Sequence, residues 1–177
     1  FEDGRHVVFS LEIRKERGES FSALGGFFRK FEMTLVASEE TDIIRTRTNA
    51  RGEDVYLYRL HGMDRAQLKE LFAAYIAQAR ELDAKPGFYN TLTSNCTTIV
   101  FDLARHIAPR LPLDYRLLLS GYLAEYAQEV GALTPGVPYA ELHDKGRITQ
   151  RALDLGSGDH FSTVIRQGVP GTEQDPQ

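Results

Sequence analysis

The sequence predicts an α+β fold in which an antiparallel sheet packs against helices. Three observations support this prediction. Residues 5–14 alternate between apolar and polar side chains, as the residues of a half-buried strand do. Turn-forming segments at 38–42 and 49–54 separate further short strand-like runs, which favours antiparallel neighbours. From Asp64 onward the apolar residues recur instead at the spacing of a helix.

The first predicted strand runs from Arg5 to Arg14. The Asp3-Gly4 pair before it is a turn signal, and we expect a partner strand upstream of Phe1. The printed chain is therefore expected to be a fragment. One face of the strand should pack into the core through four apolar side chains: Val7, Phe9, Leu11 and Ile13.

Three more strands are predicted to follow as an antiparallel meander. They cover Phe31–Ala37, Ile43–Thr48 and Val55–Leu60, and they are rich in β-branched, aromatic and aliphatic residues. An acidic turn at 38–42 and a second turn at 49–54 would connect them.

Helical patterns dominate the second half of the chain. Asp64 is predicted to cap a long helix whose apolar stripe, from Leu68 to Leu82, covers surface elsewhere on the sheet. Pro86-Gly87 would end this run. Further expectations are one or two helices in 115–130, a short helix in 141–155 and a last strand or extended arm at 160–165. Residues 1–167 would form a single domain, and 168–177 a flexible tail.

The composition is that of an ordinary globular protein. The chain has 177 residues, of which 42% are hydrophobic and 26% charged, and its net charge is −4. This balance favours neither nucleic acid nor an anionic membrane surface as a partner. A single cysteine excludes an internal disulfide. The chain has no signal peptide and no apolar run long enough to span a membrane. It also has no cluster of residues at metal-ligand spacing, and we expect neither a metal nor a cofactor. The full-length protein could carry a membrane tether outside this fragment.

The only cysteine, Cys96, lies where a loop pattern changes to a helical one. Ser94 or Asn95 is a good N-cap, so Cys96 should lie in the first helical turn, where the partial positive charge of the helix start favours a thiolate. This context suggests a nucleophile, but it also fits a buried structural cysteine. Tyr89, just upstream, could line a cleft or simply pack. The predicted helix face contains Cys96, Ile99, Val100, Leu103 and Ile107.

A thiolate nucleophile usually needs a histidine base. His106 lies on the same predicted helix but ten residues further on, about 15 Å away at a rise of roughly 1.5 Å per residue, and is excluded. His6 and His61 sit near strand ends, and we predict that neither reaches the Cys96 sulfur. His143 and His160 lie in less well defined segments.

Five segments resemble a bacterial family, the Lnb N-terminal periplasmic domain family. The most specific are Asn95-Cys-Thr-Thr98 and Arg51-Gly-Glu-Asp-Val-Tyr-Leu-Tyr58. The resemblance implies a circularly permuted papain-like (NlpC-like) cysteine-hydrolase fold. It also implies a location in the periplasm, or anchored in the inner membrane and facing the periplasm. The five segments are Ser10–Arg14, Gly26–Arg29, Asp42–Asn49, Arg51–Tyr58 and Phe88–Thr98.

The resemblance also implies roles for individual residues. Cys96 would be the nucleophile, and its base would be a histidine upstream of Phe1, held by Glu12. Asn95 and the Cys96 amide would stabilise an oxyanion. Apart from the resemblance, Tyr89 and Asn90 are expected to contact the substrate, because they lie just upstream of Cys96.

The function expected from this arrangement is that of an envelope thiol hydrolase or acyltransferase. It would act on an amide or ester of a peptide or acyl substrate, with no cofactor. The alternative is a non-catalytic periplasmic binding or assembly module that keeps the papain-like fold.

Overall fold

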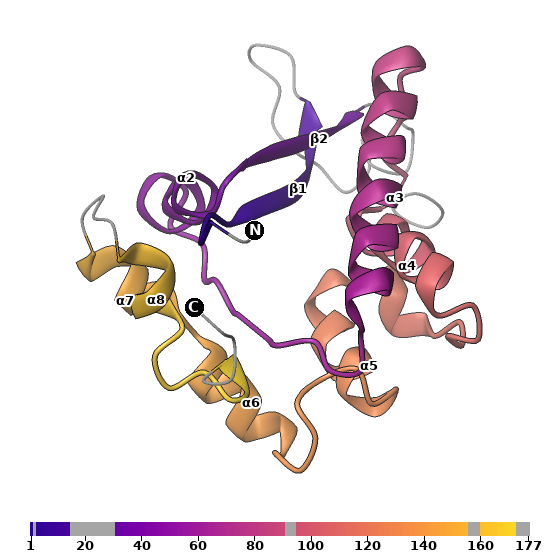
Figure 1. The fold of residues 1–177 in the computed structure, drawn as a ribbon. Coiled ribbons are helices and arrows are strands. Elements are labelled where there is room, and N and C mark those ends of the chain that lie inside the picture. Colours follow the sequence, from indigo (N-terminus) through magenta and orange to yellow (C-terminus); the bar gives the residue numbers. More distant parts are fainter. Residues whose placement is uncertain (2, 15–30, 91–94, 156–159, 173–177) are drawn as a thin grey trace. The chain divides into compact units, whose positions relative to one another are not determined.

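The computed structural model describes residues 1, 3–14, 31–90, 95–155 and 160–172 (Figure 1). The chain forms two compact units. One unit contains Phe1–Val8, Ala37–Gly62 and Ala127–Gln177, and the other contains Phe9–Val36 and Met63–Tyr126. In the described residues the fold is mixed α and β, with a two-stranded antiparallel sheet and seven α-helices, which confirms the predicted class at this level.

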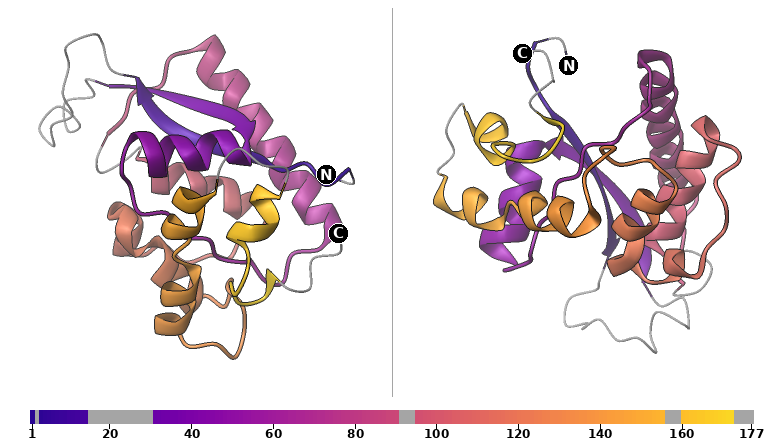
Figure 2. Two further views of the ribbon diagram at one scale, coloured as in Figure 1. Left: turned by 90° about the vertical axis from the view of Figure 1, so that its left-hand side faces the viewer. Right: turned by 90° about the horizontal axis from the view of Figure 1, so that it is seen from below.

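The sheet consists of β1 (Val7–Arg14) and β2 (Glu32–Glu39), which lie side by side in both views of Figure 2. Both strands confirm the predicted ones to within a few residues. The Glu40 amide donates a 3.3 Å hydrogen bond to the His6 carbonyl just beyond the strand ends. On its other side β2 pairs with a short extended segment around Phe88, which forms an antiparallel bridge with Glu32.

The apolar face of β1 packs on the long helix α3 (Arg65–Ala84). The Phe9 ring stacks on Tyr75 at 4.7 Å between centroids and meets Phe72 edge-on at 5.5 Å. Phe72 and Tyr75 of the α3 stripe therefore contact the same apolar face of the sheet, so the prediction that the stripe covers a different surface was wrong. Leu68, at the start of the stripe, is exposed. Asp64 caps α3 as predicted, in a capping box with Gln67. Val7, at the start of β1, is exposed.

The unit of α3 is completed by α4 (Cys96–Ile107) and by turns after it. In Figure 1, α3 and α4 run side by side. Two 3₁₀ turns follow, η2 (Tyr115–Leu118) and η3 (Ser120–Tyr122), and α5 (Leu123–Glu129) starts directly after them. These elements agree with the helices expected in this region. The buried apolar side chains here are Phe31, Phe101, Leu103, Leu117 and Tyr126.

The predicted strand at Ile43–Thr48 is wrong, and so is the acidic turn before it. The chain forms α2 (Glu40–Arg45) and continues into a π-helical turn, η1 (Thr46–Ala50). Glu40, Ile44 and Thr48 are all buried. Residues four apart lie on one side of a helix, so the helix buries all three at once, whereas the branched composition of the segment had favoured a strand.

The segment predicted as a strand at Val55–Leu60 is extended but joins no sheet in the described part of the chain. It makes two isolated antiparallel bridges, from Tyr56 to Arg147 and from Leu60 to Leu133. The predicted meander is therefore wrong. The bridge partners of the segment Val55–Leu60 lie more than 70 residues downstream, so local turn signals could not identify them.

Three short helices end the described chain: α6 (Tyr139–Gly146), α7 (Thr149–Asp154) and α8 (Phe161–Ile165). The last one is a helix where a strand or extended arm was predicted, because helical spacing puts Phe161 and Ile165 into one core. Val169 is buried too, and the residues after Thr172 lie outside the described ones. The core of this unit consists of Ile44, Ile148, Ala152, Phe161, Ile165 and Val169.

Candidate functional site

Cys96 is the first residue of α4, as predicted, and its side chain is half-buried. Asn95 is the N-cap. Its side-chain oxygen accepts a 2.8 Å hydrogen bond from the backbone amide of Thr98, and the Thr98 hydroxyl accepts one of 2.9 Å from the backbone amide of Asn95. This reciprocal pair fixes the first turn of α4 and thereby the backbone that carries the thiol.

Asn95 also ties the helix start to the turn η2. The side chain is buried, and its Nδ2 donates a 3.4 Å hydrogen bond to the Leu117 carbonyl. Both ends of the amide are thus used in holding Cys96 in place. Sequence reasoning missed the contributions of Thr98 and Leu117. A polar residue three positions after the N-cap could have indicated Thr98, but Leu117 has no comparable local signal.

Asn95→Ala is expected to lower the free energy of unfolding by about 1–2 kcal/mol, since it removes the cap and leaves the Leu117 carbonyl without this donor. Urea unfolding would measure the loss. Asp64→Ala is the matched control, because Asp64 has the same capping-box geometry on α3 but is exposed. A loss for Asn95→Ala no larger than that for Asp64→Ala would contradict the added role of the Leu117 contact.

Glu12 lies on β1, is half-buried, and accepts a 2.7 Å hydrogen bond from the buried Ser10 hydroxyl. Successive side chains of a strand point to opposite faces. Since Phe9 points toward α3, Ser10 and Glu12 point to the other face of the sheet. No hydrogen bond joins Glu12 to the Cys96 thiol, and both are residues that the structure describes.

Tyr89 and Asn90 lie at the edge of β2, and both are half-buried. The Tyr89 amide donates a 2.8 Å hydrogen bond to the Phe31 carbonyl, and two residues earlier the Gly87 carbonyl accepts one of 2.7 Å from Met33. This pairing holds the segment that leads toward Cys96 extended along the sheet. The residues between Asn90 and Asn95 lie outside the described part of the chain.

The unit that contains Cys96 has one histidine in its sequence, His106. This residue is exposed near the end of α4, and its Nδ1 lies 3.0 Å from the Asp102 carbonyl oxygen. His6 and His61 belong to the other unit, so their separation from the Cys96 sulfur stays a prediction.

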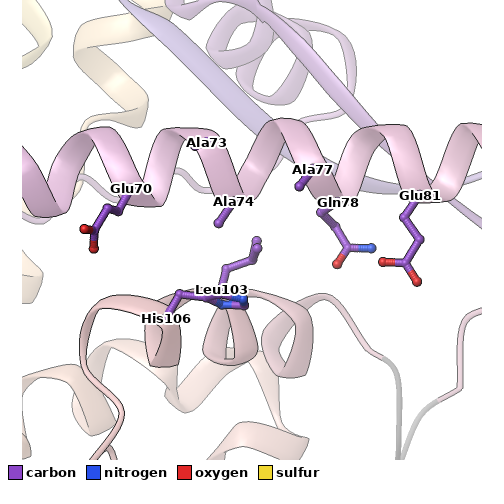
Figure 3. Close-up of a pocket in the computed structure, with 8 residues that line it drawn as sticks. All are labelled: Glu70, Ala73, Ala74, Ala77, Gln78, Glu81, Leu103 and His106. Carbon is purple, nitrogen blue, oxygen red and sulfur yellow. The ribbon is translucent and has the colours of Figure 1, made fainter.

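A groove of about 520 Å³ lies between α3 and α4 (Figure 3). In the close-up, Leu103 and His106 of α4 face a row of alanines on α3, between Glu70 and Glu81. None of the residues predicted for the site lines this groove. It therefore does not extend the candidate site around Cys96.

Two features are absent from the described residues. No group of three or more His, Cys, Asp or Glu side chains is arranged to hold a metal ion there. Among the described helices, none combines the length and the apolar character needed to cross a membrane.

Comparison with known proteins identifies a family. A family model described as the Lnb N-terminal periplasmic domain matches residues 3–121, about two thirds of the chain. This description indicates a periplasmic location. Searches of curated proteins and of solved structures gave no significant match.

Proposed function

Because this chain belongs to the Lnb N-terminal periplasmic domain family, we propose that it acts as a thiol hydrolase or acyltransferase of the bacterial envelope. The proposal includes a circularly permuted papain-like fold, in which a cysteine at a helix start is the nucleophile. One observation carries it: the only thiol of the chain is the first residue of a capped twelve-residue helix and is half-buried rather than sealed. Reactive cysteines typically occupy partly exposed positions, and helix starts are among them.

The proposed reaction begins with attack of the Cys96 thiolate on the carbonyl carbon of an amide or ester. The carbonyl π pair moves to oxygen, and the backbone amide of Cys96 donates a hydrogen bond to that oxyanion. The oxyanion then collapses, and the amine or alcohol leaves with a proton from a histidine, so a thioester remains on the sulfur. Water or an acceptor amine attacks the thioester, gives its proton back to the histidine and restores the thiolate.

Two residues support this chemistry without reacting. Asn95 is proposed as a positioning residue rather than as the oxyanion donor expected from the sequence, because its side-chain amide is hydrogen-bonded to the Thr98 backbone amide and to the Leu117 carbonyl. Glu12 would orient the base from β1 through a hydrogen bond to the second nitrogen of the imidazole. We propose that this base is the histidine that the family resemblance implies upstream of Phe1. The half-buried pair Tyr89 and Asn90 would contact the peptide or acyl substrate.

One observation favours a second function, a non-catalytic periplasmic binding or assembly module. The unit that carries Cys96 has His106 as its one histidine. The imidazole of His106 is hydrogen-bonded to the Asp102 carbonyl of the same helix. Unless a base reaches Cys96 from elsewhere, the thiol has no partner to take its proton, and the fold would act only by binding.

Alkylation of Cys96 distinguishes the two functions. At neutral pH, a chain extended upstream to include the implied histidine should react with iodoacetamide about tenfold faster than the urea-unfolded chain, since a paired thiol holds more thiolate. Replacing that histidine with alanine should remove most of the gain, and Cys96→Ser should abolish labelling. Folded extended protein that reacts no faster than the unfolded chain would disprove the hydrolase proposal.

A further inference from the structure

The turn η2 is closed by an ion pair between Asp114, which caps it, and Arg116. The Asp114 carboxylate accepts a 2.8 Å hydrogen bond from the backbone amide of Arg116, and bonds of 2.8 and 2.7 Å from two nitrogens of its guanidinium. Hydrogen bonds from the Arg116 side chain hold the pKa of Asp114 at about 2, so the carboxylate is ionised at neutral pH. A bidentate pair of this kind fixes direction as well as distance.

A similar pair at the start of the chain shows what is particular about this one. Asp3 and Arg5 are also two residues apart, and they are also bonded through the arginine's backbone amide and guanidinium. Their side chains are 51% and 73% exposed, whereas those of Asp114 and Arg116 are 22% and 12% exposed. An exposed pair contributes little, but breaking a mostly buried pair leaves a poorly solvated charge, so its geometry is strongly maintained.

Two contacts connect the turn η2 to α4, the helix that carries the thiol. Leu117, the residue after Arg116, is buried, and its carbonyl accepts the hydrogen bond from the Asn95 side chain. The Arg116 guanidinium also lies over the Tyr126 ring at 5.7 Å, and Tyr126 meets Phe101 of α4 edge-on at 6.1 Å. The ion pair therefore lies behind the contacts that hold the start and the middle of this helix.

We propose that Arg116 is a positioning residue for Cys96. The pair with Asp114 holds the turn, and the turn holds the Leu117 carbonyl against the nitrogen end of the Asn95 side chain. A carbonyl oxygen only accepts hydrogen bonds, so it keeps the oxygen end of that side chain turned toward the first turn of α4. The Cys96 backbone amide, the proposed oxyanion donor, then keeps a fixed direction. This chemical role rests on the proposed function, whereas the control of the helix start does not.

Hydrogen exchange tests the control of the helix start without any substrate. The backbone amides of Thr98 and Ile99 both donate to Asn95. Arg116→Met should speed their exchange about tenfold, because the helix start opens more often. Arg116→Lys keeps the positive charge but loses the bidentate geometry, so it should speed exchange less and in the same direction. This milder variant decides the question if Arg116→Met does not fold.

Two controls separate this effect from a general loss of stability. In every variant the amides of Gln67 and Leu68 donate to Asp64 in the same way at the start of α3, and their exchange should not change. Arg5→Met breaks the exposed pair and should leave exchange at both helix starts unchanged. Exchange at the start of α4 that no substitution of Arg116 alters would overturn the inference, and so would equal acceleration at both helix starts.

Two reagents test the chemical role in the chain extended upstream to the implied histidine. With p-nitrophenyl acetate the Cys96 thiolate attacks the carbonyl carbon, an oxyanion forms, and p-nitrophenolate leaves a thioester behind. Iodoacetamide instead loses iodide from a saturated carbon, and no oxyanion forms. Arg116→Met should therefore lower the ratio of acylation rate to alkylation rate about tenfold, while Arg5→Met should leave this ratio unchanged.

The outcomes distinguish a failure of the positioning role from a failure of the proposed function. An unchanged ratio in Arg116→Met would overturn the positioning role, even where the amides exchange faster. If the ester does not acylate Cys96 in the extended, unsubstituted protein, the proposed function fails instead. The exchange of Thr98 and Ile99 would then still decide whether Arg116 holds the helix start.

Discussion

Arg166→Met is expected to lower the free energy of unfolding by about 3–5 kcal/mol, because it leaves the Glu40 carboxylate buried without its counter-charge. Glu40 starts α2 and is 5% exposed. Both terminal nitrogens of Arg166, which follows α8, donate 2.7 Å hydrogen bonds to the two carboxylate oxygens. Urea unfolding at neutral pH would measure the loss.

The control is the double variant E40Q/R166M, which removes both charges. It should recover much of the lost stability, since the pair itself contributes little compared with an apolar or neutral replacement. A double variant as unstable as Arg166→Met alone would mean that packing around Arg166, rather than the unpaired charge, causes the loss.

The effect of Arg166→Met should depend on pH. Burial raises the pKa of Glu40, but hydrogen bonds from Arg166 and Ser162 outweigh it and hold that pKa below its usual 4.5. The pair therefore stabilises the native chain above the unfolded pKa, and this contribution is lost as the pH falls through the folded value. In Arg166→Met the unpaired carboxylate is relieved by protonation instead. The difference between the two proteins should shrink in acid, and a constant difference from pH 7 to pH 3 would contradict this account.

Phe31→Ala is the second substitution with a large expected effect, a loss of about 3–5 kcal/mol. Phe31 has no exposed surface and lies directly before β2, where its carbonyl accepts from the Tyr89 amide. Truncation leaves a cavity in the unit that contains Cys96. Alkylation of that single thiol under native conditions should therefore speed up, because the unit opens more often.

Phe88→Ala is the matched control for Phe31→Ala. Phe88 bridges to β2 from the neighbouring segment, but its side chain is 44% exposed. Its truncation should cost only about 1 kcal/mol, since less apolar surface is lost from the interior. Similar losses for the two variants would show that Phe31 is not part of the stabilising core.

Local chemistry was sufficient wherever the signal and its effect lie within a few residues of each other. Alternation of side chains predicted β1, and a polar cap before an apolar period predicted the starts of α3 at Asp64 and of α4 at Ser94 or Asn95. The position of Cys96 at the start of a helix followed from the same pattern, as did the α+β class. Each depends on hydrogen bonds and side-chain spacing inside one element.

Contacts between distant segments decided the rest. The run at Ile43–Thr48 is rich in β-branched residues, a composition that suits a strand. It is helical because the helix buries Glu40 against Arg166, 126 residues away, and Ile44 in the core that α7 and α8 form. The Leu117 carbonyl that anchors Asn95 is likewise 22 residues away. A single sequence determines the preference of each segment by itself, whereas the free energy of burial depends on partners that only the tertiary structure identifies.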